Sequence, residues 1–329
     1  MEKRQLGGSG LEVTAVGLGC WVMGGWMWGG ADDDQSIGAI HRAVELGVNF
    51  IDTAPVYGKG HSEELVGRAL EGLRDQVVLA TKCGLVWDDR GGRGYFTDED
   101  GVAIRRNLEA ASVISECEDS LRRLQTDVID VYQCHWPDPE PDGAPIEETM
   151  SALNQLLEQG KIRSAGVSNF SAEQMAKCLK HGRINSDQPQ YNMLDRSIES
   201  EILPFCRQNG VGIIAYSPLG RGILTGKVTM DRTFAKNDHR ANMKWYQPAN
   251  RKRVLEFLEK VRPIADGHGA TVAQLAANWV ISQDGVTTAI CGARRAEQVE
   301  ENVKAGEFKL TESELAEIRA LRDELGEPE

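Results

Sequence analysis

The chain has 329 residues, which at about 150 residues per domain allows one large domain or two ordinary ones. Hydrophobic residues make up 41% and charged residues 26%, as in folded globular proteins, so disordered, collagen-like and disulfide-scaffold classes are excluded. The formal charge of −13 argues against nucleic acid or an anionic membrane surface as the main partner.

The beginning of the chain predicts a cytoplasmic protein. Residues 1–5, MEKRQ, are not followed by the apolar stretch of a signal peptide. Residues 15–30 are apolar but contain six glycines, and no stretch reaches the roughly 18 to 20 residues of a membrane span. Seven scattered cysteines without a C-x-x-C pair favour reduced thiols over disulfides or a zinc site.

Short β-rich runs alternate with helical patterns along the chain. The predicted strands cover residues 15–19, 49–52, 77–82, 128–134, 162–167, 186–190, 211–216 and 287–291. Apolar residues at helical spacing lie between them, for example Ile114, Cys117 and Leu121. Ser171 with Gln174, and Thr311 with Glu314, predict two capped helix starts.

Eight βα units in one chain indicate an α/β fold, a (β/α)8 TIM barrel, with parallel strands that are apolar on both faces. The alternative, a doubly wound nucleotide-binding sheet, normally carries G-x-G-x-x-G after its first strand, and this motif is missing. Without repeats or a linker, residues 1–329 are predicted to form a single domain. Two long connections, 84–106 and 219–250, are interpreted as loops that bind or cover a ligand.

Polar residues follow most of the predicted strands. In a (β/α)8 barrel the carboxyl ends of the strands meet at one rim, where the chemistry takes place. The residues predicted to face this rim are Asp52, Tyr57, Lys82, His135, Ser168, Asn169, Gln188, Tyr216 and Arg294.

Four of these residues, Asp52, Tyr57, Lys82 and His135, suit reversible carbonyl reduction. An oxygen that gains negative charge as its carbon accepts hydride needs a nearby proton donor, and we hypothesise that Tyr57 is this donor. Lys82 would stabilise the phenolate, Asp52 would hold Lys82 charged, and His135 would orient the carbonyl oxygen.

Each of these residues also has an ordinary structural explanation. Lys82 suits a solvated lysine, Asp52 a turn or N-cap residue, and Tyr57 or His135 a packing residue. The combination of all four around three consecutive strands favours the catalytic interpretation.

Seven runs of the sequence are typical of one family: NFIDTAPVYG at 49–58, SEELVG at 62–67, LATK at 79–82, DVIDVYQCHWPD at 127–138, GKIRSAGVSNF at 160–170, YSPLGRGILTGK at 216–227 and GARR at 292–295. On these runs the sequence resembles the aldo-keto reductase superfamily. The chain is most similar to the bacterial branch with His-Trp-Pro-Asp at 135–138 and Met-Trp-Gly-Gly at 27–30.

The resemblance implies a barrel with an N-terminal β-hairpin, extra C-terminal helices and long loops, which transfers hydride between NADPH and an aldehyde, ketone or sugar carbonyl. It implies that Asp52, Tyr57, Lys82 and His135 are the catalytic tetrad. The cofactor-binding residues that it implies are Ser168, Asn169, Gln188, Tyr216, Ser217, Leu219, Gly220, Arg221, Gly222, Lys227, Arg240, Gly292, Arg294, Gln298 and Asn302.

Arg294 and Arg295 favour NADPH over NADH, since a 2′-phosphate suits a guanidinium group. Arg240 is a second phosphate candidate, although it also suits a surface charge. Aromatic residues near the rim, Trp21, Trp28, Trp87 and Trp136, are predicted to line the substrate pocket, although Trp26 and Trp28 also suit packing within their own loop. The sequence offers no metal-binding motif.

Two other functions remain open at this point. One is an NADPH-binding regulatory or redox-sensing subunit with little turnover, and the other is a metal-dependent hydrolase on the same barrel. The expected partner is a small-molecule carbonyl or alcohol, and neither its identity, the direction of reaction nor the oligomeric state follows from the sequence.

Overall fold

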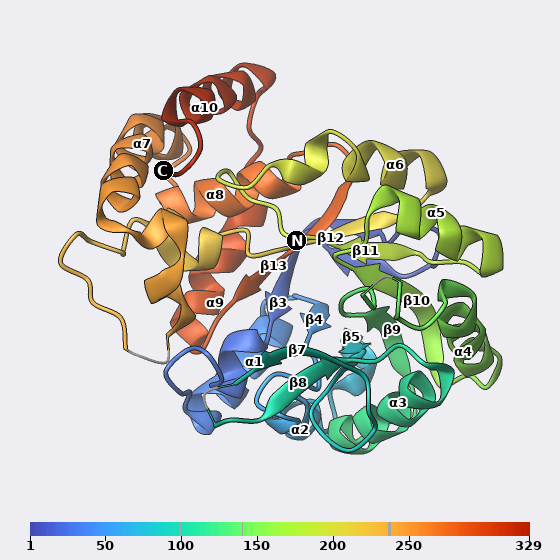
Figure 1. Ribbon diagram of the computed structural model, residues 1–329. Helices are drawn as coiled ribbons and strands as arrows, with labels where there is room; N and C mark the ends of the chain where they lie inside the picture. The colour runs from blue at the N-terminus through green and yellow to red at the C-terminus, as the bar shows by residue number, and fades with distance from the viewer. Residues whose placement is uncertain (99, 140, 236–237) are drawn as a thin grey trace.

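The computed structural model describes residues 1–98, 100–139, 141–235 and 238–329, and its centre is a closed barrel of eight parallel strands (Figure 1). The order around the barrel is β10-β11-β12-β13-β3-β4-β5-β9. The strands are β3 (Val16–Gly19), β4 (Phe50–Asp52), β5 (Val78–Cys83), β9 (Ile129–Cys134), β10 (Ile162–Ser168), β11 (Ser186–Gln188), β12 (Gly212–Tyr216) and β13 (Val286–Gly292). All eight predicted strands are confirmed.

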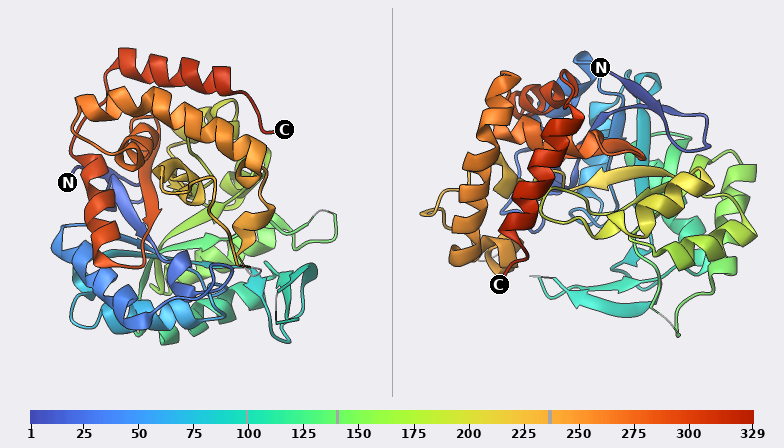
Figure 2. Two further views of the ribbon diagram at one scale, coloured as in Figure 1. Left: turned by 90° about the vertical axis from the view of Figure 1, so that its left-hand side faces the viewer. Right: turned by 90° about the horizontal axis from the view of Figure 1, so that it is seen from above.

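Helices follow the strands and surround the barrel, which confirms the (β/α)8 fold (Figures 1 and 2). They are α1 (Asp33–Glu45), α2 (His61–Ala69), α3 (Ala110–Leu124), α4 (Ile146–Glu158), α5 (Ala172–His181), α6 (Ile202–Asn209), α7 (Pro248–Gly267), α8 (Val272–Ile281), α9 (Ala296–Val303) and α10 (Glu312–Leu325). The predicted caps at Ser171 and Thr311 are confirmed. Across the described ranges, no helix is long and apolar enough to cross a membrane.

The barrel interior is apolar at one end and polar at the other. Its apolar end is closed by an antiparallel hairpin of β1 (Lys3–Gln5) and β2 (Glu12–Thr14). Side chains of the hairpin and of alternate strand positions share one buried cluster, Leu6, Val13, Phe50, Ala80, Val131, Ile214 and Ile290. The hairpin and the strands β7 and β8 lie at opposite ends of the barrel (Figure 2). The carboxyl ends of the strands therefore remain available for a site.

The connection 84–106 is not a simple loop, so that expectation was wrong. It contains β6 (Leu85–Val86), β7 (Arg93–Thr97) and β8 (Ala103–Arg106), which form an antiparallel sheet in the order β6-β8-β7. Lys59 Nζ lies 2.8 Å from Asp98 Oδ2 and 2.9 Å from Asp100 Oδ2. These ion pairs tie the turn between β7 and β8 to the segment that follows β4; residue 99 is outside the described ranges.

The connection 219–250 also contains regular structure. It has three short 3-10 helices, η4 (Gly220–Thr225), η5 (His239–Asn242) and η6 (Lys244–Tyr246), and its last residues begin α7. The buried guanidinium of Arg251 donates to the backbone oxygens of Arg232 at 2.9 Å and Tyr246 at 2.8 Å. These bonds fix the described parts of the segment to α7; residues 236 and 237 are outside the described ranges.

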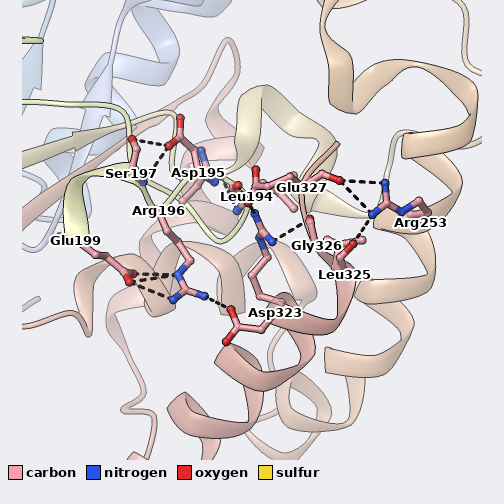
Figure 3. A network of polar contacts seen from close by, with 12 residues as sticks. Leu194, Asp195, Arg196, Ser197, Glu199, Arg253, Asp323, Leu325, Gly326 and Glu327 are labelled. Carbon is pink, nitrogen blue, oxygen red and sulfur yellow. Dashed lines mark hydrogen bonds and ion pairs between the residues drawn. The ribbon is translucent and has the colours of Figure 1, made fainter. Parts of the chain in front are cut away.

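The last helix, α10, packs along α7 outside the barrel (Figure 2). Arginines join α10 and the residues after it to the rest of the chain (Figure 3). Arg196 pairs with both Glu199 and Asp323, and Arg253 donates to the backbone oxygens of Leu325 and Glu327. The buried Arg322 donates to Leu194 O at 2.9 Å, in the segment after β11.

Candidate active site

The four residues predicted to be catalytic lie together at the carboxyl ends of three neighbouring strands. Lys82 Nζ, on β5, is 2.6 Å from Asp52 Oδ1 at the end of β4. The same ammonium is 3.4 Å from the Tyr57 hydroxyl, in the segment after β4. The His135 ring, directly after β9, meets the Tyr57 ring edge-on with centroids 5.7 Å apart. A proton donor, an ammonium, a carboxylate and an imidazole therefore share one site.

Burial dominates the electrostatics of this group. Loss of solvation, with the nearby Asp52 carboxylate, raises the pKa of Tyr57 well above its usual value. Burial also lowers the pKa of Lys82, against the opposing pull of Asp52. Burial and the charge of Lys82 hold the pKa of His135 well below 6.5. At neutral pH the site thus contains a protonated Tyr57 and a neutral His135.

Two buried amides complete the surroundings of Asp52. Its Oδ2 accepts from Gln188 Nε2 at 2.7 Å and from Gln133 Nε2 at 3.3 Å. The sequence reasoning missed Gln133. Strand alternation from His135 back to Gln133 and Val131 on β9 places an amide on the inner face, and this signal would have found it.

Ser168, Asn169 and Tyr216, three of the predicted cofactor-binding residues, lie beside one another. Asn169 adopts a left-handed conformation with φ of 62° and donates from Nδ2 to the His135 backbone oxygen at 3.0 Å. The Tyr216 hydroxyl donates to Asn169 Oδ1 at 3.0 Å, and Ser168 Oγ donates to the Gln188 backbone oxygen at 2.7 Å. These bonds connect the ends of β10, β11 and β12 to His135.

A cavity of about 1400 Å³ opens over this group. Its lining includes most of the predicted site residues: Trp21, Trp28, Asp52, Tyr57, His135, Trp136, Ser168, Asn169, Gln188, Tyr216, Ser217, Leu219, Arg221, Gly222, Lys227, Arg240, Gly292, Arg294, Gln298 and Asn302. Its volume exceeds the roughly 300–1,000 Å³ of pockets for one small ligand. The space fits a dinucleotide together with a substrate.

Three predicted site residues do not line this cavity. Lys82 is completely buried beneath the cavity, so it can affect a ligand only through the residues that it contacts. Gly220 lines a separate cavity of about 700 Å³ on the other side of η4. Trp87 packs beside Leu85 and Ile104 in an aromatic cluster under the β6-β8-β7 sheet.

The glycine-containing segment after β12 runs along the wall of the cavity. Arg221 and Gly222 have φ of 58° and 104°, and the second value is one that residues with a side chain rarely adopt. The Tyr246 hydroxyl donates to the Arg221 backbone oxygen at 2.8 Å and holds this turn. A glycine backbone here permits close approach of a phosphate-bearing ligand.

At the far end of the cavity, arginines surround Trp28. Arg294 donates to the Trp28 backbone oxygen at 2.7 Å, and the Arg240 guanidinium lies 4.9 Å from the centre of the Trp28 ring. Arg240 also pairs with Asp238 at 2.6 Å, which offsets part of its charge. Arg295 lines the same end and is exposed.

Aromatic rings wall the catalytic end. Trp21 stacks on Tyr57 with centroids 6.0 Å apart, and Trp26 stacks on Phe96 of β7 at 5.7 Å. Trp26 thus packs against a distant segment as well as lining the cavity. Sequence reasoning missed Phe96 and His239, whose ring stacks on Trp21 at 5.2 Å, because both lie in segments treated as loops.

A comparison of the sequence with models of protein families agrees with the observed fold. The family model described as the Aldo/keto reductase family matches residues 15–323. The chain belongs to the aldo/keto reductase family. The superfamily resemblance is therefore confirmed over nearly the whole chain.

Individual aldo/keto reductases are similar over their full length. The chain is 38% identical to the NADH-specific methylglyoxal reductase of Escherichia coli, over 99% of both chains. It is 39% identical to the glycerol dehydrogenase of Gluconobacter oxydans, with a TM-score of 0.88 over 98% of this chain and 96% of that structure. It is 31% identical to an aldo-keto reductase of Klebsiella pneumoniae in complex with NADPH, with a TM-score of 0.73 over 98% and 96%.

Aldo/keto reductases are oxidoreductases that use nicotinamide cofactors. The cavity suits such a cofactor, because polar side chains at Ser168 and Asn169 lie at one end and Gln298 and Asn302 at the other. The turn at Gly222 lines the same cavity.

Proposed function

We propose that this aldo/keto reductase is an NADPH-dependent oxidoreductase that reversibly reduces aldehydes and ketones, including small sugar or hydroxy-aldehydes, to alcohols. The observation that carries the proposal is the placement of Lys82 Nζ between Asp52 Oδ1, at 2.6 Å, and the Tyr57 hydroxyl, at 3.4 Å. This placement gives the chain a buried, positioned phenol where a carbonyl oxygen would receive a proton.

In the direction of reduction, a nicotinamide cofactor bound in the cavity would supply the hydride that the carbonyl carbon accepts. The Tyr57 hydroxyl then donates its proton to the carbonyl oxygen, which leaves an alcohol and a phenolate. The neutral His135 ring, edge-on to Tyr57, is placed to hydrogen-bond the same oxygen and to fix the orientation of the substrate.

In the direction of oxidation, the phenolate of Tyr57 accepts the proton of the alcohol. Burial opposes this state, since it raises the pKa of Tyr57. The ammonium of Lys82 stabilises the phenolate, and Asp52 stabilises that ammonium in a buried position. The three residues thus allow one phenol to serve both directions.

The cofactor assignments rest on the cavity lining. Ser168, Asn169 and Gln188 are proposed to hold the nicotinamide carboxamide, and Tyr216 to stack on its ring. The backbone of Arg221 and Gly222, with Ser217, Leu219 and Lys227, is proposed to contact the pyrophosphate. Gly292, Arg294, Gln298 and Asn302 are proposed to contact the adenosine.

Arginines at the adenosine end support NADPH as the preferred cofactor. Arg240, Arg294 and Arg295 line this end, and a 2′-phosphate would add a doubly negative group beside them. Because the Escherichia coli relative is named as NADH-specific, the preference is tested by the dissociation constants of NADPH and NADH.

The aromatic walls support a small, uncharged carbonyl substrate. Trp21, Trp26, Phe96 and Trp136 line the catalytic end and offer apolar faces. Methylglyoxal and glyceraldehyde are suitable first substrates, because relatives are named as a methylglyoxal reductase and a glycerol dehydrogenase.

The decisive experiment measures loss of NADPH absorbance with these aldehydes for the native protein and for Tyr57→Phe. Removal of a general acid is expected to lower the rate by roughly 10²- to 10⁴-fold. NADPH binding by the variant, followed by tryptophan fluorescence, serves as the control for folding. Equal rates for the two proteins would overturn the role of Tyr57, and NADPH binding without turnover by the native protein would overturn the proposed activity.

A further inference from the structure

Gln133 is a fully buried amide in the barrel that none of the proposed roles uses. It lies on β9 directly opposite Lys82 of β5 in the strand register. Its Nε2 is 3.3 Å from Asp52 Oδ2. Gln133 thus contacts the carboxylate that in turn holds Lys82.

The barrel is built to leave room for this side chain. Gly166 on β10 pairs with Gln133 in the register, and a Cβ atom at Gly166 would lie 3.1 Å from Gln133 Cγ and 2.3 Å from Ser186 Oγ. A side chain at residue 166 would therefore clash with Ser186 and crowd the Gln133 side chain. The absence of a side chain at Gly166 thus leaves the space in which the Gln133 side chain lies.

The Asp52 carboxylate is buried, so each of its oxygens requires a donor. Oδ1 accepts from Lys82 at 2.6 Å. Oδ2 accepts from Gln188 at 2.7 Å and from Gln133 at 3.3 Å. Loss of both amide donors would leave this buried oxygen without the hydrogen bonds that they donate.

The two amides differ in what else they can contact. Gln188 lines the cavity, where a bound nicotinamide is proposed to engage it. Gln133 is beneath the cavity wall, and among the described residues its side chain contacts only Asp52 and Gln188 through hydrogen bonds. A ligand can therefore recruit Gln188, whereas Gln133 remains with Asp52.

We propose that Gln133 is a positioning residue, which keeps Asp52 Oδ2 paired while Gln188 engages the cofactor, so that Oδ1 stays on Lys82. The proposal rests on the proposed function, because it uses the role of Gln188 in cofactor binding. It makes the side chain of residue 133 a determinant of cofactor affinity although it does not line the cofactor cavity.

The first test replaces Gln133 with methionine, which keeps the length of the side chain and removes the amide. In Gln133→Met, Gln188 must leave Asp52 Oδ2 unpaired in order to bind the cofactor. The dissociation constant of NADPH, measured by tryptophan fluorescence, is expected to rise by about tenfold or more, the cost of an unmade bond to a buried charge.

Gln283→Met is the matched control. Gln283 is also buried, and its Nε2 donates to the Trp279 backbone oxygen at 2.8 Å, far along the chain from Asp52. It loses an amide in the same way, so it reports the general effect of that loss on the protein. Its dissociation constant for NADPH is expected to stay at the native value.

The second test, Gln133→Glu, separates positioning from simple filling of space. The introduced carboxyl group is protonated at low pH. Burial and the adjacent Asp52 raise its pKa, and the Lys82 ammonium opposite it on β5 opposes this shift. In that form it donates to Asp52 Oδ2 and replaces the amide. As the pH rises and the group ionises, the donor is lost and a second negative charge appears beside Asp52.

The ratio of the NADPH dissociation constants of Gln133→Glu and native protein is therefore expected to be near one at low pH and to increase with pH. A ratio that does not vary with pH would overturn the proposal, as would native affinity in Gln133→Met. If Gln133→Met fails to fold, the pH dependence of Gln133→Glu decides alone. A failure of the proposed function is recognised from a different variant. If the proposed function is wrong, Tyr57→Phe turns over at the native rate, whatever the variants at residue 133 show.

Discussion

The side chain of Asn169 donates from Nδ2 to the backbone oxygen of His135 at 3.0 Å. This bond joins a residue proposed to bind the cofactor with the residue proposed to orient the substrate. Asn169 reaches it from a left-handed conformation, with φ of 62°, which asparagine tolerates better than alanine.

Asn169→Ala is expected to combine backbone strain with loss of this bond. The free energy of unfolding should fall by about 1–3 kcal/mol, the cost of a residue held in an unfavourable conformation. Asn169→Gly removes the strain and still lacks the amide, so it should recover most of the stability and none of the NADPH affinity. Urea unfolding and fluorescence titration check the two effects; recovery of affinity by glycine would contradict the role of the amide.

Lys82 and Asp52 form a buried ion pair. Removing one partner alone should lower the free energy of unfolding more than removing both charges. Lys82→Met leaves the Asp52 carboxylate unpaired, so the free energy of unfolding should fall by about 3–5 kcal/mol. Adding Asp52→Asn removes that charge and should restore part of the stability. Denaturant unfolding of both single variants and the double variant tests this; independent, additive losses would show that the pair is not coupled.

The raised pKa of Tyr57 predicts opposite pH dependences for the two directions. Reduction requires the protonated phenol, so its rate should stay constant from roughly pH 6 to 9, below the raised pKa. Oxidation requires the phenolate, so its rate should increase with pH over the same range. Because the pKa of His135 is lowered, no histidine titration should interrupt either profile. Steady-state rates across this range check the prediction, and a reduction rate that falls from pH 7 to 9 contradicts it.

Cofactor preference should depend on Arg294 and Arg295. Their joint replacement by alanine is expected to raise the dissociation constant of NADPH by about tenfold or more and to leave that of NADH nearly unchanged, since only NADPH carries the 2′-phosphate. Arg207→Ala, on the surface and paired with Asp284, is the matched control for loss of an arginine. Equal effects on both cofactors would assign the two arginines to some other contact.

Glu116 gives the stability of the protein a pH dependence of its own. Burial raises the pKa of this carboxyl to about 8, against a usual value of 4.5, although it accepts from the Gly84 backbone at 2.9 Å and from Ser112. The folded state therefore holds a proton that the unfolded state releases. Stability from this group is complete below pH 4.5 and is lost as the pH rises toward about 8.

Glu116→Gln keeps the size of the side chain and removes the titration. Relative to native protein, the variant should gain stability between pH 5 and 8, as followed by thermal unfolding at a series of roughly half-unit pH steps. Parallel curves for the two proteins over this range would show that Glu116 is already ionised in the folded state.

The sequence was sufficient for the barrel, because buried parallel strands are short apolar runs and most of them are followed by a polar residue. Once the barrel is predicted, Asp52, Lys82 and His135 are expected to lie close together, because they lie at the carboxyl ends of the neighbouring strands β4, β5 and β9. The strands β7 and β8 were missed because glycine and arginine interrupt the alternation of apolar and polar residues along them.

Contacts between distant segments were beyond reach for a related reason. His239 and Trp21 stack although more than two hundred residues separate them, and nothing in the local sequence of either predicts the other. Gln133 was within reach, since its position on β9 follows from the alternation that also places His135.

The ion pairs of Lys59 connect the sheet that forms part of the cavity wall with the segment that carries Tyr57. Lys59 is two residues after Tyr57, and through Asp98 it is bound to the turn between β7 and β8, whose Phe96 forms part of the cavity wall. A bulky carbonyl compound that displaces Phe96 would pull on the segment carrying the acid. Larger substrates are therefore expected to react more slowly than small ones, through misalignment of the Tyr57 phenol, even where the cavity has volume to hold them.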